Sequence, residues 1–64
     1  MNTKKKFKVY YNNGESTDIE SEKVNADKVV ESLRYLEFYN GSGRTKEIVS
    51  EFRFGAIAGY QIVS

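Results

Sequence analysis

The stretch KFKVYYNNGESTDIE, residues 6–20, alternates apolar and polar side chains on both sides of a turn signal. In its first half Phe7, Val9 and Tyr11 fall on one face, which is the period-two pattern of a half-buried strand. The triplet Asn12-Asn13-Gly14 predicts a three-residue loop, because glycine accepts the left-handed conformation that closes such a hairpin. The stretch therefore predicts an antiparallel hairpin with strands over residues 6–11 and 15–23.

The loop also predicts the register of these two strands. Val9 then faces Thr17 and Phe7 faces Ile19 on the apolar face. On the other face three lysines oppose three carboxylates, in the pairs Lys4–Glu22, Lys6–Glu20 and Lys8–Asp18. A slip of one residue would bring Phe7 beside Glu20 on the buried face, so we expect this register.

Two structures are open for residues 24–34. Val29, Val30, Leu33 and Leu36 have the spacing of a helical stripe, and Asn25 is a suitable N-cap residue. The same residues also allow the second strand to continue through a bend. We expect the first structure, a short helix within residues 26–34.

Further strands are expected over residues 36–39, about 45–54 and 60–63, with Tyr60 and Ile62 buried in the last one. Residues 40–43 are expected to end the first of these strands. Residues 55–59 are expected to form a tight connection or a single helical turn. No register between the 36–39 and 45–54 strands places all charged side chains on one face and all apolar side chains on the other. The register of these two strands is therefore not predicted. The predicted fold is α+β, a small curled antiparallel sheet of about five strands with one short helix between strands 2 and 3. The alternative is an all-β, SH3-like small barrel.

The chain has 64 residues, which predicts one small domain over residues 1–64, with residues 1–5 frayed. It has no Cys and no His, so disulfides and Cys/His zinc sites are excluded, and we expect no cofactor and no metal. Asp18, Glu20 and Glu22 share one solvated strand face, without the further oxygen ligands that Ca²⁺ requires. No apolar run approaches the roughly 20 residues of a membrane span, and no apolar stretch follows the N-terminal lysines as in a secretory signal. These features favour a cytoplasmic location without membrane contact.

The residues predict a binding protein rather than an enzyme. Nucleophile–base catalysis usually requires His, which the chain lacks. Tyr10, Tyr35 and Tyr39 point away from the predicted core, near Arg53, and Tyr and Arg are typical anchors of protein interfaces. The alternative for each tyrosine is a ring that only covers a thin sheet. We therefore expect a protein partner of unknown identity on Tyr10, Tyr35, Tyr39 and Arg53.

Two other functions are open. Lys5, Lys8 and Tyr10 suggest single-stranded nucleic acid on a β surface. Against this, the net charge is only +1, and the predicted register sets Lys4, Lys6 and Lys8 each opposite a carboxylate. A self-associating structural protein is the third hypothesis, because a homodimer would extend a thin core and cover an open sheet edge.

Three segments of the chain carry a resemblance: residues 7–15, residues 38–41 and residues 52–62. Together they resemble small uncharacterised proteins encoded by phages, prophages and plasmids of Gram-positive bacteria. The shared features are strands and turns, so the resemblance brings no catalytic residues. It implies a protein that binds a host protein and alters its activity.

Overall fold

The computed structural model describes residues 4–63, and within them the chain forms strands and two 3₁₀ turns but no α-helix. The strands are β1 (Lys5–Tyr11), β2 (Ser16–Ser21), β3 (Lys23–Val30), β4 (Leu33–Asn40), β5 (Glu47–Arg53) and β6 (Ile57–Ile62). The turns are η1 (Gly43–Thr45) and η2 (Phe54–Ala56). Residues 1–3, part of the segment expected to be frayed, lie outside the described residues, whereas Lys5 already belongs to β1.

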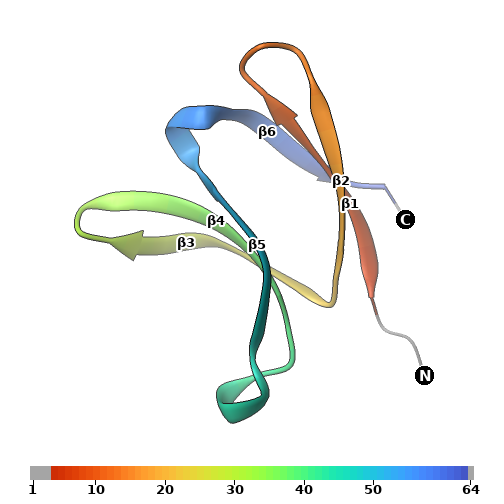
Figure 1. Cartoon of the computed structure of the whole chain (residues 1–64), viewed down its shortest axis with the longest axis vertical. Helices are drawn as coiled ribbons and strands as arrows, with labels where there is room; N and C mark the ends of the chain where they lie inside the picture. The colour runs from red at the N-terminus through yellow and green to blue at the C-terminus, as the bar shows by residue number, and fades with distance from the viewer. Residues whose placement is uncertain (1–3, 64) are drawn as a thin grey trace.

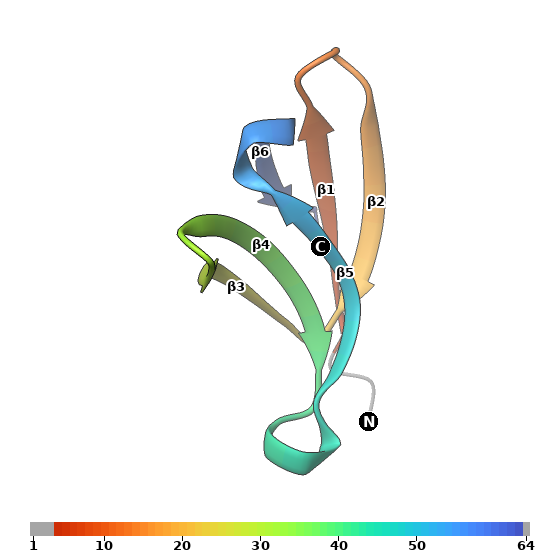
Figure 2. The ribbon, with the colours of Figure 1, turned by 60° about the vertical axis from the view of Figure 1, so that its left-hand side comes forward.

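The strands form two three-stranded antiparallel sheets (Figure 1). Sheet A has the order β2-β1-β6 and sheet B the order β3-β4-β5, so β1 and β4 are the two central strands. A single residue, Glu22, carries the chain from β2 into β3, and η2 carries it from β5 into β6. The sheets meet where β2 passes into β3 and diverge toward the β1–β2 and β3–β4 turns (Figure 2).

The core is built from the central strand of each sheet. Among residues 4–63 the fully buried apolar side chains are Phe7 and Val9 of β1 and Leu36 and Phe38 of β4. The rings of Phe7 and Phe38 lie 5.0 Å apart between their centroids. Phe38 also makes edge-to-face contacts with Phe52 and Tyr60, at 6.0 Å and 6.2 Å. Aromatic packing therefore joins the two sheets.

Polar groups hold the corner where the chain changes sheet. The backbone N–H of Glu22 donates to Oδ1 of Asn40 over 2.8 Å, and the Glu22 carboxylate accepts a hydrogen bond from the Gly41 N–H at 2.7 Å. Ser21, which is fully buried, donates its hydroxyl to the Lys23 carbonyl at 3.0 Å. These bonds satisfy backbone groups that neither sheet pairs, and they attach the corner to the end of β4.

The prediction for the first hairpin is confirmed. β1 pairs with β2 in the expected register, with Phe7 opposite Ile19, Val9 opposite Thr17 and Lys8 opposite Asp18. The Gly14 N–H donates to the Tyr11 carbonyl at 3.1 Å, and Gly14 has a φ of +90°, as the predicted loop requires.

The expected α+β fold is wrong, because residues 23–30 form strand β3 instead of a helix. Val29, Val30 and Leu33, which would form the buried stripe of the helix, are 60 %, 44 % and 45 % exposed. A bulge between Asn25 and Lys28 adds one residue to β3 and interrupts its alternation, so the apolar positions take on a helical spacing. The second possibility for residues 24–34, a strand that continues after a bend, agrees with the observed structure.

The later strands differ from the predictions in their bounds. β4 begins at Leu33 rather than at residue 36, and β6 begins at Ile57 rather than at residue 60. Tyr60 and Ile62 were expected to be buried but are 39 % and 60 % exposed. They lie on β6, an edge strand of sheet A that pairs with β1 on one side, and the ring of Tyr60 meets Phe38 of sheet B only edge to face.

A two-residue turn of unusual composition joins β3 to β4. Val30 pairs with Leu33, and the two loop residues Glu31 and Ser32 have φ values of +52° and +70°. Two positive φ angles define a type I′ turn, for which Asn-Gly is the preferred sequence. Residues other than glycine and asparagine are strained there, so this turn was not recognisable from the sequence.

Replacing Ser32 by glycine should stabilise the protein. Glycine adopts a φ of +70° without steric cost, so Ser32→Gly should raise the free energy of unfolding by about 0.5–1.5 kcal/mol. Urea denaturation followed by circular dichroism measures the change. Ser32→Ala is the matched control, since it removes the hydroxyl but keeps the strain, and it should bring no gain. Equal effects of the two variants would contradict the assignment of strain to this turn.

The turn between β4 and β5 contains a glycine whose surroundings leave no room for a side chain without a shift of the backbone. Gly41 has a φ of +71°, and a Cβ atom at this position would lie 2.4 Å from the Thr45 carbonyl oxygen. Gly43 has a φ of +55°, but a Cβ atom there would enter open space.

The two glycines therefore make a matched pair for substitution. Gly43→Ala should cost about 1 kcal/mol of stability through its backbone conformation alone. Gly41→Ala should cost more, about 2–4 kcal/mol, because the clash with backbone adds to the strain. Thermal melts of both variants give the comparison, and a Gly41→Ala variant no less stable than Gly43→Ala would refute the close approach.

Candidate functional site

The outer face of sheet B combines aromatic and charged side chains. Leu36 and Phe38 of β4 are buried in the core, so alternation turns Tyr35, Glu37 and Tyr39 to the opposite side of the sheet. The strands on each side of β4 add their own residues to this face. We refer to it below as the outer face of sheet B.

Cross-strand register determines the neighbours on this face. Tyr35 lies between Lys28 of β3 and Arg53 of β5. Tyr39 lies between Lys23 of β3 and Ile48 of β5.

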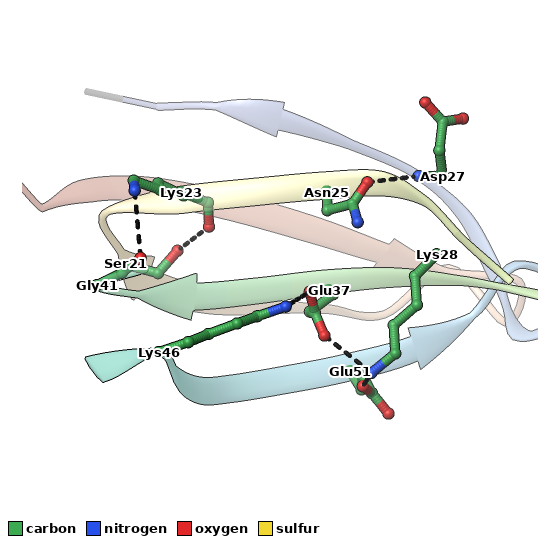
Figure 3. A network of polar contacts seen from close by, with 9 residues as sticks. All are labelled: Ser21, Lys23, Asn25, Asp27, Lys28, Glu37, Gly41, Lys46 and Glu51. Carbon is green, nitrogen blue, oxygen red and sulfur yellow. Dashed lines mark hydrogen bonds and ion pairs between the residues drawn. The ribbon is translucent and has the colours of Figure 1, made fainter. Parts of the chain in front are cut away.

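Glu37 is almost completely buried although it faces outward. Its exposed fraction is 1 %, because the side chains of Lys28 and Lys46 extend over it from opposite directions (Figure 3). Lys28 Nζ donates a hydrogen bond to Oε2 of Glu37 at 2.8 Å and also pairs with Glu51. Lys46 Nζ lies 2.9 Å from Oε1, but Oε1 accepts no hydrogen bond with good geometry. Lys46 therefore forms an ion pair with Glu37.

These contacts shift two pKa values in opposite directions. The pKa of Glu37 is lowered, first by the hydrogen bond from Lys28 and further by Lys46, against the opposing effect of burial. The pKa of Lys28 is raised, first by its hydrogen bond to Glu37 and then by that to Glu51. Both groups therefore stay charged at neutral pH.

Tyr39 lies beside two lysines. Lys46 Nζ is 4.6 Å from the centroid of its ring, and Lys23 Nζ is 5.9 Å from it. Both distances fit cation–π contacts, and Lys23 also donates to the Gly41 carbonyl at 3.2 Å. Lys46 thus contacts both Glu37 and Tyr39, so it connects the charged and the aromatic parts of this face.

The structure brings together three of the four residues predicted to bind protein. Tyr35, Tyr39 and Arg53 share the outer face of sheet B, and Tyr35 lies directly opposite Arg53 in the register. Tyr10 lies on β1, in the other sheet, where its hydroxyl accepts a hydrogen bond from Gln61 Nε2 at 3.0 Å. The fourth residue therefore does not belong to this group.

The three residues of the nucleic-acid hypothesis are not on one face. Strand alternation places Lys8 and Tyr10 on the outer side of β1 and Lys5 on the same side as Phe7 and Val9. Lys8 also lies between Asp18 of β2 and Gln61 of β6. The three do not form a continuous basic surface.

Sequence reasoning missed Glu37, Lys28 and Lys46 as a unit. The sequence predicts a helix around Lys28, and it predicts no register for the strand that carries Glu51. The one available signal is that β4 and β5 place Glu37 opposite Glu51, a like-charge pair that needs a cation nearby. This signal appears only once the register is known.

Within residues 4–63 no group of three or more acidic side chains has an arrangement that would hold a metal ion. The same part of the chain contains no helix of sufficient length and apolarity to cross a membrane. No family model, curated protein or solved structure matches the chain.

The buried carboxylate should make stability depend on pH. Glu37→Gln should lower the melting temperature at pH 7 by roughly 5–15 °C, because the amide loses the attraction of both lysines. The folded-state pKa of Glu37 is lowered, so its contribution is complete above the unfolded pKa of about 4.3 and is lost as pH falls through the lower folded value. The difference between the two proteins should therefore shrink below about pH 4 in thermal melts.

Glu51→Gln is the matched control for this experiment. Glu51 pairs with the same Lys28, but its side chain is 36 % exposed, so its loss should matter less. An equal loss of stability in both variants, or a Glu37→Gln effect that persists unchanged at low pH, would contradict the role of the buried carboxylate.

Proposed function

We propose that the chain is a non-enzymatic protein-binding module that contacts its partner with the outer face of sheet B. The observation that carries this proposal is the adjacency of Tyr35 and Arg53 across β4 and β5, on the face that also presents Tyr39. Tyr and Arg are enriched among the residues that dominate binding energy at protein interfaces. Tyrosine buries a large ring and keeps a polar tip for hydrogen bonding.

Fixed side chains support this proposal. Lys28 and Lys46 are held by Glu37, and the Tyr39 ring lies against Lys46. Side chains that are already held before binding lose less conformational entropy when a partner arrives. Part of this face is therefore preorganised for contact.

The charges of this face favour an acidic partner. The charged side chains that the strand register and the ion pairs assign to this face are Lys23, Lys28, Glu37, Lys46, Glu51 and Arg53. Four cations thus meet two carboxylates, an excess above the net charge of +1 of the whole chain. Electrostatic complementarity then favours a protein with an acidic surface. The resemblance to phage and plasmid proteins makes a host protein of a Gram-positive bacterium the partner to look for.

The competing explanation is that the tyrosine rings only cover the sheet. Tyr35 and Tyr39 are half-buried, and Tyr39 packs beside lysines of its own chain. A covering role predicts a loss of stability on truncation, whereas a binding role predicts a loss of partner. The two roles are separated by measuring folding and binding on the same variants.

Changing Tyr35 to alanine should weaken partner capture. Immobilised protein is incubated with a Gram-positive lysate, and captured proteins are quantified by mass spectrometry. Recovery of a specific acidic partner should fall at least about tenfold with Tyr35→Ala, the size of effect typical of a central tyrosine. Arg53→Glu should reduce it as well, and raising the salt from about 0.05 M to about 0.5 M should weaken what remains.

Tyr10→Ala provides the matched control. It removes the same side chain from another half-buried tyrosine, which lies on the central strand of the other sheet. Its recovery of the partner should equal that of the unchanged protein, and melting temperatures confirm that both variants are folded. Equal recovery by Tyr35→Ala and Tyr10→Ala would exclude the outer face of sheet B as the binding surface.

A further inference from the structure

The two sheets leave four edge strands, β2 and β6 in sheet A and β3 and β5 in sheet B. Natural proteins protect such edges with charged residues, because an uncharged edge can pair with another strand. Three of these edges carry charges: Asp18 and Glu20 on β2, Lys23, Asp27 and Lys28 on β3, and Glu47, Glu51 and Arg53 on β5. β6 has the sequence IAGYQI and carries no charge.

The backbone of β6 has groups directed toward the free edge. The Val63 N–H donates to the Lys6 carbonyl at 2.7 Å, so the backbone N–H and C=O groups of Val63 are directed toward β1. The direction of these backbone groups alternates along a strand, so those of Gln61 are also directed toward β1. The backbone groups of Tyr60 and Ile62 are directed toward the free edge. The N–H and C=O groups of Tyr60 and Ile62 are thus available to a further strand.

Apolar side chains accompany these backbone groups. Tyr60 and Ile62 lie on the same side of sheet A as Phe7 and Val9, yet they are 39 % and 60 % exposed. A hollow of about 190 Å³ continues this apolar region toward the start of β6. It is lined by Phe54, Ile57, Ala58, Gly59 and Tyr60. A strand added at this edge would therefore also extend the core.

We propose that the free edge of β6 binds β6 of a second copy of this chain, antiparallel and around a two-fold axis. The two copies of sheet A then form one continuous sheet of six strands, in the order β2-β1-β6-β6-β1-β2. This interface lies on sheet A and is independent of the proposed function of sheet B. Either proposal can therefore fail without the other.

The regular part of β6 determines the register of this pairing. A bulge lies near Ala58, where the partner of Tyr10 is Gly59 and the partner of Tyr11 is Ile57. Pairing is therefore confined to the residues after the bulge, and the two-fold axis passes through Gln61. Tyr60 then faces Ile62 of the second copy, a favourable pair of an aromatic and a β-branched side chain. Gln61 faces Gln61 of the second copy.

The absence of charge favours a second copy over a foreign peptide. Around a two-fold axis, each residue of an edge strand lies opposite or close to the same residue of the second copy. Two copies of β2 would therefore repel each other through Asp18 and Glu20. β6 carries no charge that would select a foreign peptide of a particular sequence. Its own sequence satisfies the self-complementarity that an isologous interface requires.

Sedimentation equilibrium over a wide range of protein concentrations tests the proposal. The interface is small, so a dimer with a Kd between about 10 µM and 1 mM is expected. Gln61→Lys and Gln61→Glu each place like charges at the two-fold axis, so each variant alone should have a Kd raised at least about tenfold. An equimolar mixture of the two variants should restore dimers. A protein that stays monomeric at about 1 mM, or a Gln61→Lys variant that dimerises like the unchanged protein, would overturn the proposal.

Amide hydrogen exchange gives a second test that needs no substitution. Protection of the Tyr60 and Ile62 amides should rise at least about fivefold from dilute to concentrated protein, because these N–H groups bond only to the second copy. The Gln61 and Val63 amides bond within the chain, so their protection should not change beyond the common background. Equal concentration dependence at all four amides would overturn the proposed edge.

Discussion

The rings of Phe7 and Phe38 lie 5.0 Å apart between the central strands of the two sheets, and the fold depends on this contact. Each three-stranded sheet has one apolar face, and that face must be covered because exposed apolar surface in water lowers stability. Each sheet supplies the cover for the other through its central strand, with Val9 and Leu36 completing the contact. Loss of one large aromatic from such a core costs about 3–5 kcal/mol, which is comparable with the whole stability of about 3–10 kcal/mol expected at this length.

A core of this size leaves the outer faces of the sheets without a second layer. The smallest extent of the chain is 13 Å, close to the thickness of two stacked sheets. Side chains on the outer faces must therefore be covered by one another. The long stems of Lys28 and Lys46 extend over Glu37, and burial of this carboxylate results from neighbours on its own sheet. The same construction holds polar and aromatic groups on a surface that a partner can reach.

The candidate site was predictable only in part, for reasons that particular residues make clear. Alternation along residues 35–39 was sufficient to turn Tyr35 and Tyr39 away from the core. The position of Arg53 opposite Tyr35 needed the β4–β5 register, which a bulge between Phe38 and Tyr39 hides from any pattern of period two. The network around Glu37 needed in addition the β3–β4 register, and the expected helix over residues 26–34 concealed it. Burial of Tyr60 and Ile62 was wrongly predicted, since alternation indicates the face of a strand but not whether another sheet covers it.

By itself the sequence determined the first hairpin, because its signals are local: an alternating strand, a loop that closes at Gly14, and charges that match across only one register. Tertiary structure alone decided that residues 23–30 form a strand. Their apolar spacing suits a helix equally well, and the pairing of β3 with β4 resolves that ambiguity by satisfying the backbone. The tertiary structure also decided which side chains are shielded from solvent, because the extent of each sheet depends on pairings between residues distant in the chain. Glu37 is buried and Ile62 exposed for this reason, although hydrophobicity would have placed them the other way round.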